Sequence, residues 1–415
     1  MVGFRGWLAA GVVGVVACGG AVAATFAGLG FLPNGNASSA AAVSADGATI
    51  VGSAFDGQKT VAVRWVNGQI EPLGVIPTQP QASGAGSVSG DGSVIVGTSG
   101  VFPNMQGFRW EAGTLAPIGY LPGFSTGSAA TSVSRDGSTV VGWSFNGANF
   151  RGLRLVGGSL QALPDLPGGI EDSAANAVSA DGSIMAGRGI SPGTTYEACI
   201  WVNGSAAMGL GDLPGGDSHS HVQGMNGDGS IHVGYANSAS QSGGLWGEAA
   251  RWVNGGPPES LGDLPGGAFN GYAFGVSDDG GVIVGFSTTA LGVEAFVWDA
   301  ENGMRLLRQV LEDDYGLDLT GWVLRVASAV TPDGRRIVGS GLNPDGLSEG
   351  WVVDLGCELA ADVDGDGDVD FADLNALLGN FNSTGVGLAG DIDGDGDVDF
   401  ADLNVLLGVF NTACE

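Results

Sequence analysis

The nine residues Ser44-Ala45-Asp46-Gly47-Ala48-Thr49-Ile50-Val51-Gly52 decide the fold. In this segment a Ser-x-Asp-Gly turn leads directly into a β-branched run. Asp-Gly between two such runs is a strong signal for a β-hairpin, because the turn requires a positive φ angle. The same signature returns six more times along the chain. The seven copies begin at Ser44, Ser89, Ser134, Ser179, Asn226, Ser277 and Thr331.

The copies have a period in the forties. The Asp residues of the first four copies are 45 residues apart, and the later intervals are 47, 51 and 54. A variable loop follows each hairpin and leads to a third run such as Ala62-Val63-Arg64-Trp65, and a fourth run ends in Leu-Gly-x-Leu-Pro, as at 261–265. Four strands per unit fit one blade of a β-propeller. The sequence therefore predicts an all-β fold, a seven-bladed β-propeller over residues 25–355.

The two ends of this region predict how the ring closes. The last unit reaches its third strand at 351–355 and has no fourth strand of its own. A matching segment, Gly28-Leu29-Gly30-Phe31-Leu32-Pro33, stands near the start of the chain. An open array would leave two exposed sheet edges that invite aggregation. We therefore expect the N-terminal segment to complete the seventh blade without a covalent link.

The Leu-Gly-x-Leu-Pro-Gly turns, the Ser-x-Asp-Gly hairpins and Ala-Phe-x-Trp strands such as 295–298 resemble those of the extracellular HAF-repeat family. The segment 303–341, with Gly321-Trp322, is similar to the last unit of such proteins. The resemblance implies a repeat architecture outside the cytoplasm. It implies no particular chemistry.

The charge of the chain changes abruptly near residue 356. Residues 357–415 contain 14 Asp or Glu and no Lys or Arg, whereas the preceding residues contain 30 acids and 14 bases. We therefore expect a separate domain at 356–415. The net charge of −30 argues against a nucleic-acid partner and provides no basic patch for an anionic membrane.

Two segments of the acidic tail, 362–382 and 391–411, differ at 3 of 21 positions. Calcium takes six to eight oxygen ligands, and a 12-residue loop supplies them from positions 1, 3, 5, 7, 9 and 12, with Gly at position 6. In the first loop the predicted ligands are Asp362, Asp364, Asp366, the carbonyl of Asp368, Asp370 and Asp373. In the second loop they are Asp391, Asp393, Asp395, the carbonyl of Asp397, Asp399 and Asp402. Two bound Ca²⁺ ions are predicted.

Each loop leads into a short predicted helix with an apolar stripe, and no helix precedes it. This paired loop–helix pattern resembles a type I dockerin, with Asp373 and Asp402 where a full EF-hand has Glu. The resemblance implies attachment to a cohesin-like protein. The tail departs from the family at loop positions 10 and 11, which are Phe371-Ala372 and Phe400-Ala401, and in having no basic residue. A cohesin-like protein and a glycan both remain possible partners.

Residues 1–24 are read as a signal peptide, with Arg5 before an apolar run and Ala21-Val22-Ala23 before a cut between Ala23 and Ala24. Val15-Val16-Ala17-Cys18 also fits a bacterial lipobox, in which Cys18 would carry the lipid, and an uncleaved anchor is a third possibility. Each alternative places the mature chain outside the cytoplasm, in the extracellular space or at the cell surface.

The flanking residues Cys357 and Cys414 are expected to form one disulfide, because disulfides persist in exported proteins. Cys199 occupies a strand position that is apolar in most copies, so we expect a buried, inert thiol.

No catalytic residues are predicted. His219 and His221 would share one face of a strand, but two ligands do not make a zinc site. The acids of the Leu-Pro loops, such as Asp165 and Asp212, recur with the repeat and are expected to be structural. We therefore favour a secreted binding or assembly protein over the alternative, a polysaccharide-degrading glycoside hydrolase. We expect a ligand on the face that carries the variable second-to-third loops, of which 235–247 is the longest.

Overall fold

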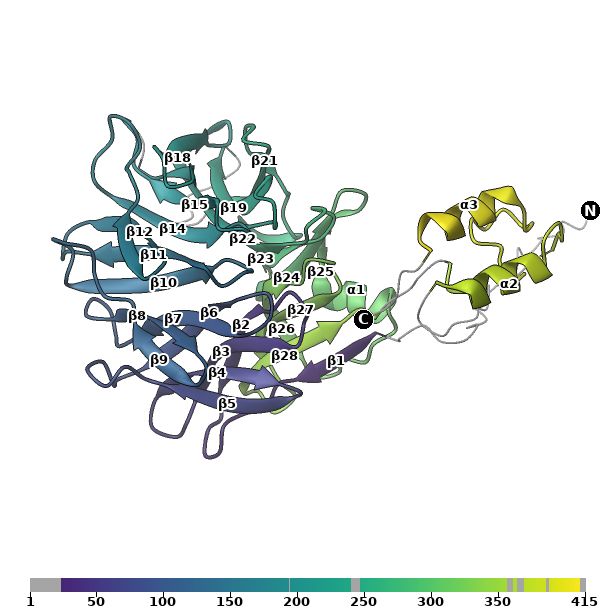
Figure 1. Cartoon of the computed structure of the whole chain (residues 1–415), viewed down its shortest axis with the longest axis horizontal. Coiled ribbons are helices and arrows are strands. Elements are labelled where there is room, and N and C mark those ends of the chain that lie inside the picture. The colour runs from purple at the N-terminus through teal and green to yellow at the C-terminus, as the bar shows by residue number, and fades with distance from the viewer. Residues whose placement is uncertain are drawn as a thin grey trace, which may run out of the picture. The chain divides into compact units, whose positions relative to one another are not determined.

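The computed structural model describes residues 24–193, 195–239, 247–356, 361–363, 369–385 and 388–410. The chain divides into two compact units, one of which is Thr25–Asp354, while the C-terminal unit begins at Leu355. Thr25–Asp354 forms seven four-stranded antiparallel sheets that fan around a common centre (Figure 1). The predicted seven-bladed propeller is therefore confirmed.

The first four blades follow the order of the sequence. Blade 1 contains β2 (Ser38–Val43), β3 (Thr49–Phe55), β4 (Thr60–Val66) and β5 (Gln69–Gly74). Blade 2 contains β6 (Ser83–Val88), β7 (Val94–Ser99), β8 (Gln106–Glu111) and β9 (Thr114–Pro117). Blade 3 contains β10 (Gly127–Val133), β11 (Thr139–Phe145), β12 (Phe150–Val156) and β13 (Ser159–Ala162). Blade 4 contains β14 (Ser173–Val178), β15 (Ile184–Gly189), β16 (Glu197–Val202) and β17 (Met208–Gly211).

The last three blades include the one that closes the ring. Blade 5 contains β18 (Gly215–Met225), β19 (Ile231–Ser238), β20 (Glu248–Val253) and β21 (Glu259–Ser260). Blade 6 contains β22 (Gly266–Val276), β23 (Ile283–Thr289), β24 (Gly292–Asp299) and β25 (Gly303–Leu306). Blade 7 contains β26 (Val323–Val330), β27 (Arg336–Leu342), β28 (Ser348–Asp354) and, as its fourth strand, β1 (Thr25–Gly28).

The N-terminal segment closes the ring, as expected, because β1 pairs antiparallel with β28 at the edge of blade 7. The pairing strand is Thr25–Gly28, however, and most of the predicted segment 28–33 follows it outside the sheet. Phe26 lies opposite Val353, and Gly28 lies opposite Trp351. Figure 1 shows these two segments, far apart in the sequence, side by side. The hydroxyl of Ser38 in blade 1 then accepts the Gly350 amide of blade 7 at 3.1 Å. Closure thus uses a full strand pairing together with a buried side-chain bond.

The Ser-x-Asp-Gly turns form through local hydrogen bonds, which blade 2 illustrates. Gly92 has a φ of +72°, as the hairpin signal required. The Ser89 hydroxyl donates to Asp91 at 2.7 Å and accepts the Val94 amide at 2.9 Å. The amide of Ser93 also donates to Asp91, and this bond is the main reason that the pKa of Asp91 falls to about 2.

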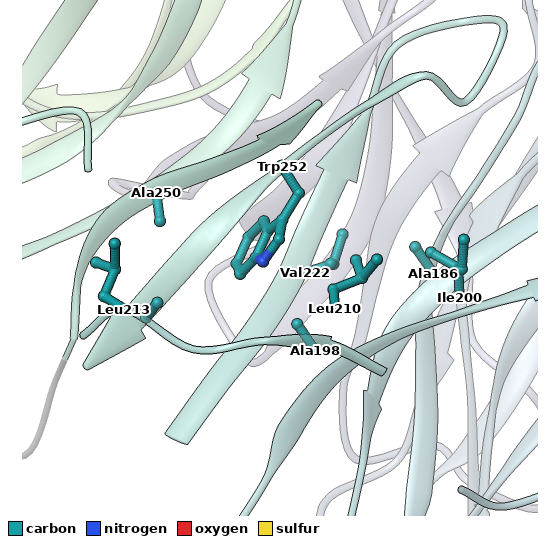
Figure 2. Close-up of a cluster of buried hydrophobic side chains, with 9 residues drawn as sticks. Ala186, Ala198, Ile200, Leu210, Leu213, Val222, Ala250 and Trp252 are labelled. Atoms are coloured by element: carbon teal, nitrogen blue, oxygen red, sulfur yellow. The ribbon is translucent and has the colours of Figure 1, made fainter. Parts of the chain in front are cut away.

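Tryptophan side chains fill the space between neighbouring blades. Trp252 of blade 5 is fully buried in one cluster with Val222 of its own blade and with Ala198 and Leu210 of blade 4 (Figure 2). Ala250, two residues before Trp252, faces the same cluster, whereas Ala249 belongs to the cluster between blades 5 and 6. The alternation of bulky and small residues in the third strand therefore lets each sheet pack on both faces.

Each innermost strand contains a β-bulge three residues before its Ser-x-Asp-Gly turn. A bulge leaves one residue outside the ladder and re-aims its side chain. The seven bulge residues are Ala41, Gly86, Thr131, Asn176, Gln223, Phe274 and Ser328. They bring one residue of every blade to the centre of the ring.

Two features differ from the sequence expectations. Helix α1 (Leu307–Asp313) connects blades 6 and 7 and buries Leu307, Val310 and Leu311, whereas no helix was expected in the propeller. Tyr235 was placed at the start of a variable loop, but it lies inside β19 and is buried. Most of that loop, including Trp246, lies outside the described residues.

The C-terminal unit contains α2 (Phe371–Gly379) and α3 (Phe400–Gly408), in agreement with the expected paired loop–helix fold. Leu377 and Leu406 are fully buried in a shared cluster. Phe371 contacts Phe410 and Phe400 contacts Phe381, in both cases edge to face with 5.1 Å between ring centroids. Among the described residues, no helix is long and apolar enough to cross a membrane.

Candidate functional site

A cavity of about 680 Å³ occupies the centre of the propeller and is lined chiefly by the innermost strands of all seven blades. Its lining contains the seven bulge residues and small residues such as Ala85, Ser87 and Ala130, and no ionisable side chain. The chain has a net charge of −30, but none of this charge lies on the cavity lining, which suits an uncharged ligand. A volume of this size is typical of small-molecule sites.

One end of the cavity is spanned by an ion pair. Arg135 and Asp278 occupy the variable position of the Ser-x-Asp-Gly turns in blades 3 and 6. The Arg135 guanidinium donates to both Asp278 oxygens, at 2.5 and 2.7 Å, and the Gly227 amide of blade 5 donates to the same carboxylate at 2.7 Å. Because blades 3 and 6 are three apart in a ring of seven, this pair crosses the end of the ring that carries the Asp-Gly turns. The opposite end, called here the variable face, carries the second-to-third loops and the blade connections.

A network of tyrosines and histidines lies on the variable-face side of blades 4 to 6. Tyr235 of blade 5 is its centre. The Tyr235 hydroxyl lies 3.2 Å from Nε2 of His219 and 3.4 Å from Nδ1 of His221. The Tyr235 ring contacts Tyr272 of blade 6, with 4.3 Å between ring centroids and an angle of 51° between the ring planes. The sequence had placed the two histidines on one strand face, and the structure brings both of them to this tyrosine.

The other nitrogens of the two imidazoles also have partners. Nδ1 of His219 lies 3.1 Å from the Thr195 hydroxyl, and Nε2 of His221 contacts the amide nitrogen of Asn176. Burial lowers the pKa of both histidines, and the nearby Arg188 guanidinium lowers each further. Both rings are therefore neutral at pH 7. Since every ring nitrogen is already engaged, the network supports a structural role better than a metal site.

Arg188 links this network to aromatic residues on blades 2 and 3. Its guanidinium lies over the Tyr196 ring at 3.9 Å and over the Phe150 ring at 5.5 Å. Phe150 in turn contacts Phe145 at 4.7 Å between centroids, and Phe145 contacts Phe102, which is 58% exposed. A chain of aromatic contacts thus crosses the variable face from blade 2 to blade 6. Phe145, Tyr235 and Tyr272 are buried, whereas Phe102 presents an exposed ring that suits the apolar face of a sugar.

The recurring acids of the Leu-Pro loops have structural partners. Asp165 accepts the Ser173 hydroxyl at 2.8 Å and pairs with Arg151, and Asp212 accepts the backbone amides of His219 and Leu213. Burial raises the pKa of both carboxyls. These acids hold the blade connections in place, as the repeat pattern indicated, and no pair of free carboxylates emerges from them.

Two other polar residues of the propeller, Cys199 and His232, are buried. Cys199 is fully buried, and burial raises the pKa of its thiol well above the usual range, so it is unreactive. His232 is 1% exposed, and neither of its ring nitrogens has a hydrogen-bond partner. It lies opposite Trp252 in the β19–β20 ladder, inside the core and not at any site.

In the C-terminal unit, the second acidic loop is described in full. Its carboxylates form two groups, Asp391 with Asp393 and Asp395, and Asp397 with Asp399 and Asp402, and the oxygens within each group lie within 4.8 Å of one another. The side chain of Asp397 takes part, whereas the sequence had assigned a ligand role to its carbonyl. Desolvation, followed by repulsion from the neighbouring carboxylates, raises the pKa of Asp397.

Asp402 organises this loop through its backbone contacts. Its carboxylate accepts the amides of Ile392 at 2.6 Å, Asp393 at 3.1 Å and Asp399 at 2.8 Å. In contrast, Oδ1 of Asp391 and Oδ1 of Asp397 are buried without a hydrogen-bond partner. Buried carboxylate oxygens that lack partners are unfavourable in water-free surroundings, and a bound cation satisfies them. The donor set of this loop therefore fits a calcium ion.

The first loop repeats this arrangement as far as it is described. Asp373 accepts the amides of Val363 at 2.6 Å and Asp370 at 2.8 Å, the counterparts of two contacts of Asp402. Asp362 and Asp370 are also described. Several predicted residues lie outside the described part of the chain, namely Asp364, Asp366, Asp368, Cys357, Cys414, Cys18 and Ala23.

The residues that the sequence analysis missed are Asn176, Gln223 and Phe274. Each lies three residues before its turn, at a position that is small in other blades, such as Ala41 and Gly86. Aligning the seven repeats would have marked this position as variable. The bulge that turns it toward the cavity leaves no signature in the local pattern.

Comparisons with known proteins return only distant structural likeness. No protein-family model matches the sequence, and no curated protein is detectably similar to it. The β-propeller domain of the Trilobed protease from Pyrococcus furiosus is 11% identical, with 76% of this chain and 94% of that chain covered and a TM-score of 0.49. Oligogalacturonate lyase from Vibrio parahaemolyticus is 12% identical, with 81% and 98% covered and a TM-score of 0.47.

TolB from Acinetobacter baumannii is 14% identical with a TM-score of 0.33, and the match covers 76% of this chain and 55% of TolB. The chain thus spans about half the length of that protein. At these identities and TM-scores the likeness carries no argument about activity. The assignment of this chain to the seven-bladed propeller fold rests on its own seven sheets.

Proposed function

We propose that this chain is an exported, non-catalytic binding protein. Its propeller binds a glycan at the variable face, and its dockerin-like C-terminal unit binds two Ca²⁺ ions and attaches the protein to a partner. The observation that supports glycan binding is the central cavity, which has an uncharged lining that includes the ring of Phe274 and which has the ion pair of Arg135 and Asp278 at one end.

The calcium half rests on the second acidic loop. The partnerless oxygens of Asp391 and Asp397, together with the two carboxylate groups, provide the oxygen-rich surroundings that Ca²⁺ prefers. The positive charge of the ion would relieve the repulsion between these carboxylates. Asp399 and Asp402 also cap α3, so the residues that hold the ion fix the start of the helix.

The attachment role follows from the exposed aromatic residues of the C-terminal unit. Phe371 and Phe400 begin α2 and α3 and are 69% and 67% exposed. Both occupy loop position 10, where dockerins contact cohesins. Because these positions are aromatic here, we expect a partner with an apolar recognition surface, a cohesin-like protein before a glycan.

A non-catalytic role is favoured because the recurring acids are engaged in structural bonds and the histidines in a closed network. The resemblance to HAF-repeat proteins agrees with such a role outside the cytoplasm. Mass spectrometry of the mature N-terminus separates the three alternatives. A chain that begins at Ala24 supports soluble export, a lipidated Cys18 supports a lipoprotein, and a chain that keeps residues 1–24 supports an uncleaved anchor.

A glycan array probed with the full-length chain, in calcium and in chelator, tests the binding function. We expect retention of a defined glycan class, with the bound glycan recovered at its original length. Shortened products would instead support the alternative, a polysaccharide-degrading hydrolase. No retention on any glycan would overturn the glycan proposal.

A further inference from the structure

The wall of the central cavity is asymmetric at the level of the bulges. Blades 4, 5 and 6 contribute the large residues Asn176, Gln223 and Phe274, whereas blades 7, 1 and 2 contribute Ser328, Ala41 and Gly86. All six line the cavity. The free volume therefore lies against the small residues, opposite a wall that combines two amides with an aromatic ring.

We propose that this cavity binds the terminal residue of a neutral glycan, which enters from the variable face and packs against Asn176, Gln223 and Phe274. The inference rests on the proposed glycan-binding function and assigns it a site and a substrate class. The three residues supply complementary contacts, since a pyranose ring presents an apolar C–H face and a rim of hydroxyl groups.

The tyrosine–histidine network fixes the orientation of Asn176. The amide nitrogen of Asn176 donates to the Val222 carbonyl at 2.9 Å and contacts Nε2 of His221. Because both N–H groups are used, the amide cannot rotate without losing two contacts. Its oxygen is left as a fixed acceptor at the cavity wall, suited to a ligand hydroxyl. The network of Tyr235, His219 and His221 thus becomes a support for a binding residue.

Gln223 and Phe274 complete the wall. The side-chain amide of Gln223, at the cavity wall, makes no hydrogen bond within the described part of the chain. It can therefore donate to one ligand hydroxyl and accept from another. The Phe274 ring is held by Tyr272 and Phe286, at 6.0 and 5.8 Å between centroids, and is partly exposed at the cavity. A ring held on its other side is a rigid platform for stacking.

The lining also predicts selectivity against acidic sugars. No cationic side chain lines the cavity, so a carboxylate inside it would lose its hydration without gaining an ion pair. The ion pair of Arg135 and Asp278 obstructs the far end, so a polysaccharide cannot thread through the ring. The cavity therefore accepts a chain end and excludes a chain interior.

The test is calorimetric titration of the calcium-loaded full-length chain with cellohexaose, maltohexaose, xylohexaose, mannohexaose and hexagalacturonate. We expect one neutral hexasaccharide to bind and the acidic one not to bind. Gln223→Ala and Phe274→Leu should each weaken that binding roughly tenfold, because each removes one ligand contact. Gln223→Ala removes no structural hydrogen bond, so it stays informative if Phe274→Leu lowers the melting temperature.

Val156→Ala is the control, because Val156 is exposed at the end of β12, away from the variable face, and does not line the cavity. Its binding should equal that of the wild type. Phe102→Leu separates the cavity from the rest of the variable face, because Phe102 is exposed on that face and does not line the cavity. If Phe102→Leu weakens binding while Gln223→Ala and Phe274→Leu do not, the cavity inference is overturned and binding at the variable face stands. Tighter binding of hexagalacturonate than of every neutral sugar would also overturn the inference. If no glycan binds even on the array, the proposed function fails as well.

Discussion

Arg135 and Asp278 lie 143 residues apart in the sequence and join blade 3 to blade 6 through two parallel hydrogen bonds. The equivalent turn position holds small or rigid residues elsewhere, namely Ala45, Gly90, Ala180, Gly227 and Pro332. A Cβ at Gly227 would lie 2.7 Å from Oδ1 of Asp278 and 2.8 Å from a guanidinium nitrogen of Arg135, so a side chain there would displace the ion pair. Two long side chains and their small neighbours thus obstruct one end of the ring.

A double-mutant cycle with Arg135→Met and Asp278→Asn should give a coupling free energy of about 1 kcal/mol. The bidentate geometry strengthens the pair, but solvent screens it because both side chains are more than a third exposed. Urea unfolding measures it. The exposed pair of Arg251 and Glu259, which lies within one blade, is the matched control and should show weaker coupling. Additive effects of the two substitutions at Arg135 and Asp278 would contradict an energetic link between blades 3 and 6.

Removing the closing strand should destabilise the whole ring. A chain that lacks residues 25–33 loses β1 and the buried Leu32, and it exposes the edge of β28. We expect a lower melting temperature and aggregation, measured by differential scanning calorimetry and light scattering. A chain that lacks only residues 1–24 keeps β1 and is the control. Equal melting of the two truncated chains would refute closure by β1.

Most of the propeller could be predicted from the sequence because its signals are local and repeated. Three features follow from motifs that recur in most copies. They are the positive φ of Gly92, the packing of Trp252 and Ala250 on the same face of the sheet, and the pairing of β1 with β28. Helix α1 could not be anticipated in the same way. It lies in an insertion between blades 6 and 7, where the repeat is longest and has no counterpart for comparison.

The candidate site was predictable in part. The two histidines were marked by their spacing, but their shared partner Tyr235 was assigned to a loop, because β19 is longer than the corresponding strands β7 and β15. Contacts such as Asn176 with His221 join different blades, and no single-repeat pattern encodes them. The carboxylates of each acidic loop, in contrast, lie within 12 consecutive residues, so their spacing alone defined the two loops.

Replacing His232 by Ile should stabilise the propeller and change its response to acid. The equivalent strand position is Ile in four other blades, at Ile50, Ile95, Ile283 and Ile337. His232 buries two ring nitrogens without partners, and removing such groups is worth about 1–2 kcal/mol. We expect His232→Ile to unfold at higher urea concentration than the wild type at pH 7.5.

The acid response has a defined sign. Burial lowers the pKa of His232 to about 4, and Asp228 opposes this shift. Between about pH 6.5 and pH 4 the unfolded state binds the proton and the folded state does not, so stability falls as the pH falls through this window. The loss from His232 is about 3 kcal/mol. His219 and His221 have lowered pKa values too, so the variant should keep part of the slope. Equal slopes for wild type and variant would refute the assignment.

Calcium uptake by the full-length chain should depend on the acidic loops one at a time. Without a cation, neighbouring carboxylates repel each other by roughly 1 kcal/mol per pair even in water. Helices α2 and α3 contain nine residues each, too few to be stable alone. We therefore expect two ions per chain by calorimetry, and a gain in helical circular dichroism that chelator reverses.

Asp393→Asn with Asp395→Asn should lower uptake to one ion, because both acids are exposed and serve only the second loop. Asp318→Asn is the control, since Asp318 is an exposed acid that accepts an amide two residues ahead, as Asp393 does, and it should leave two ions bound. Two ions in the double variant, or none in the wild type, would show that the tail is an acidic surface and not a paired calcium module.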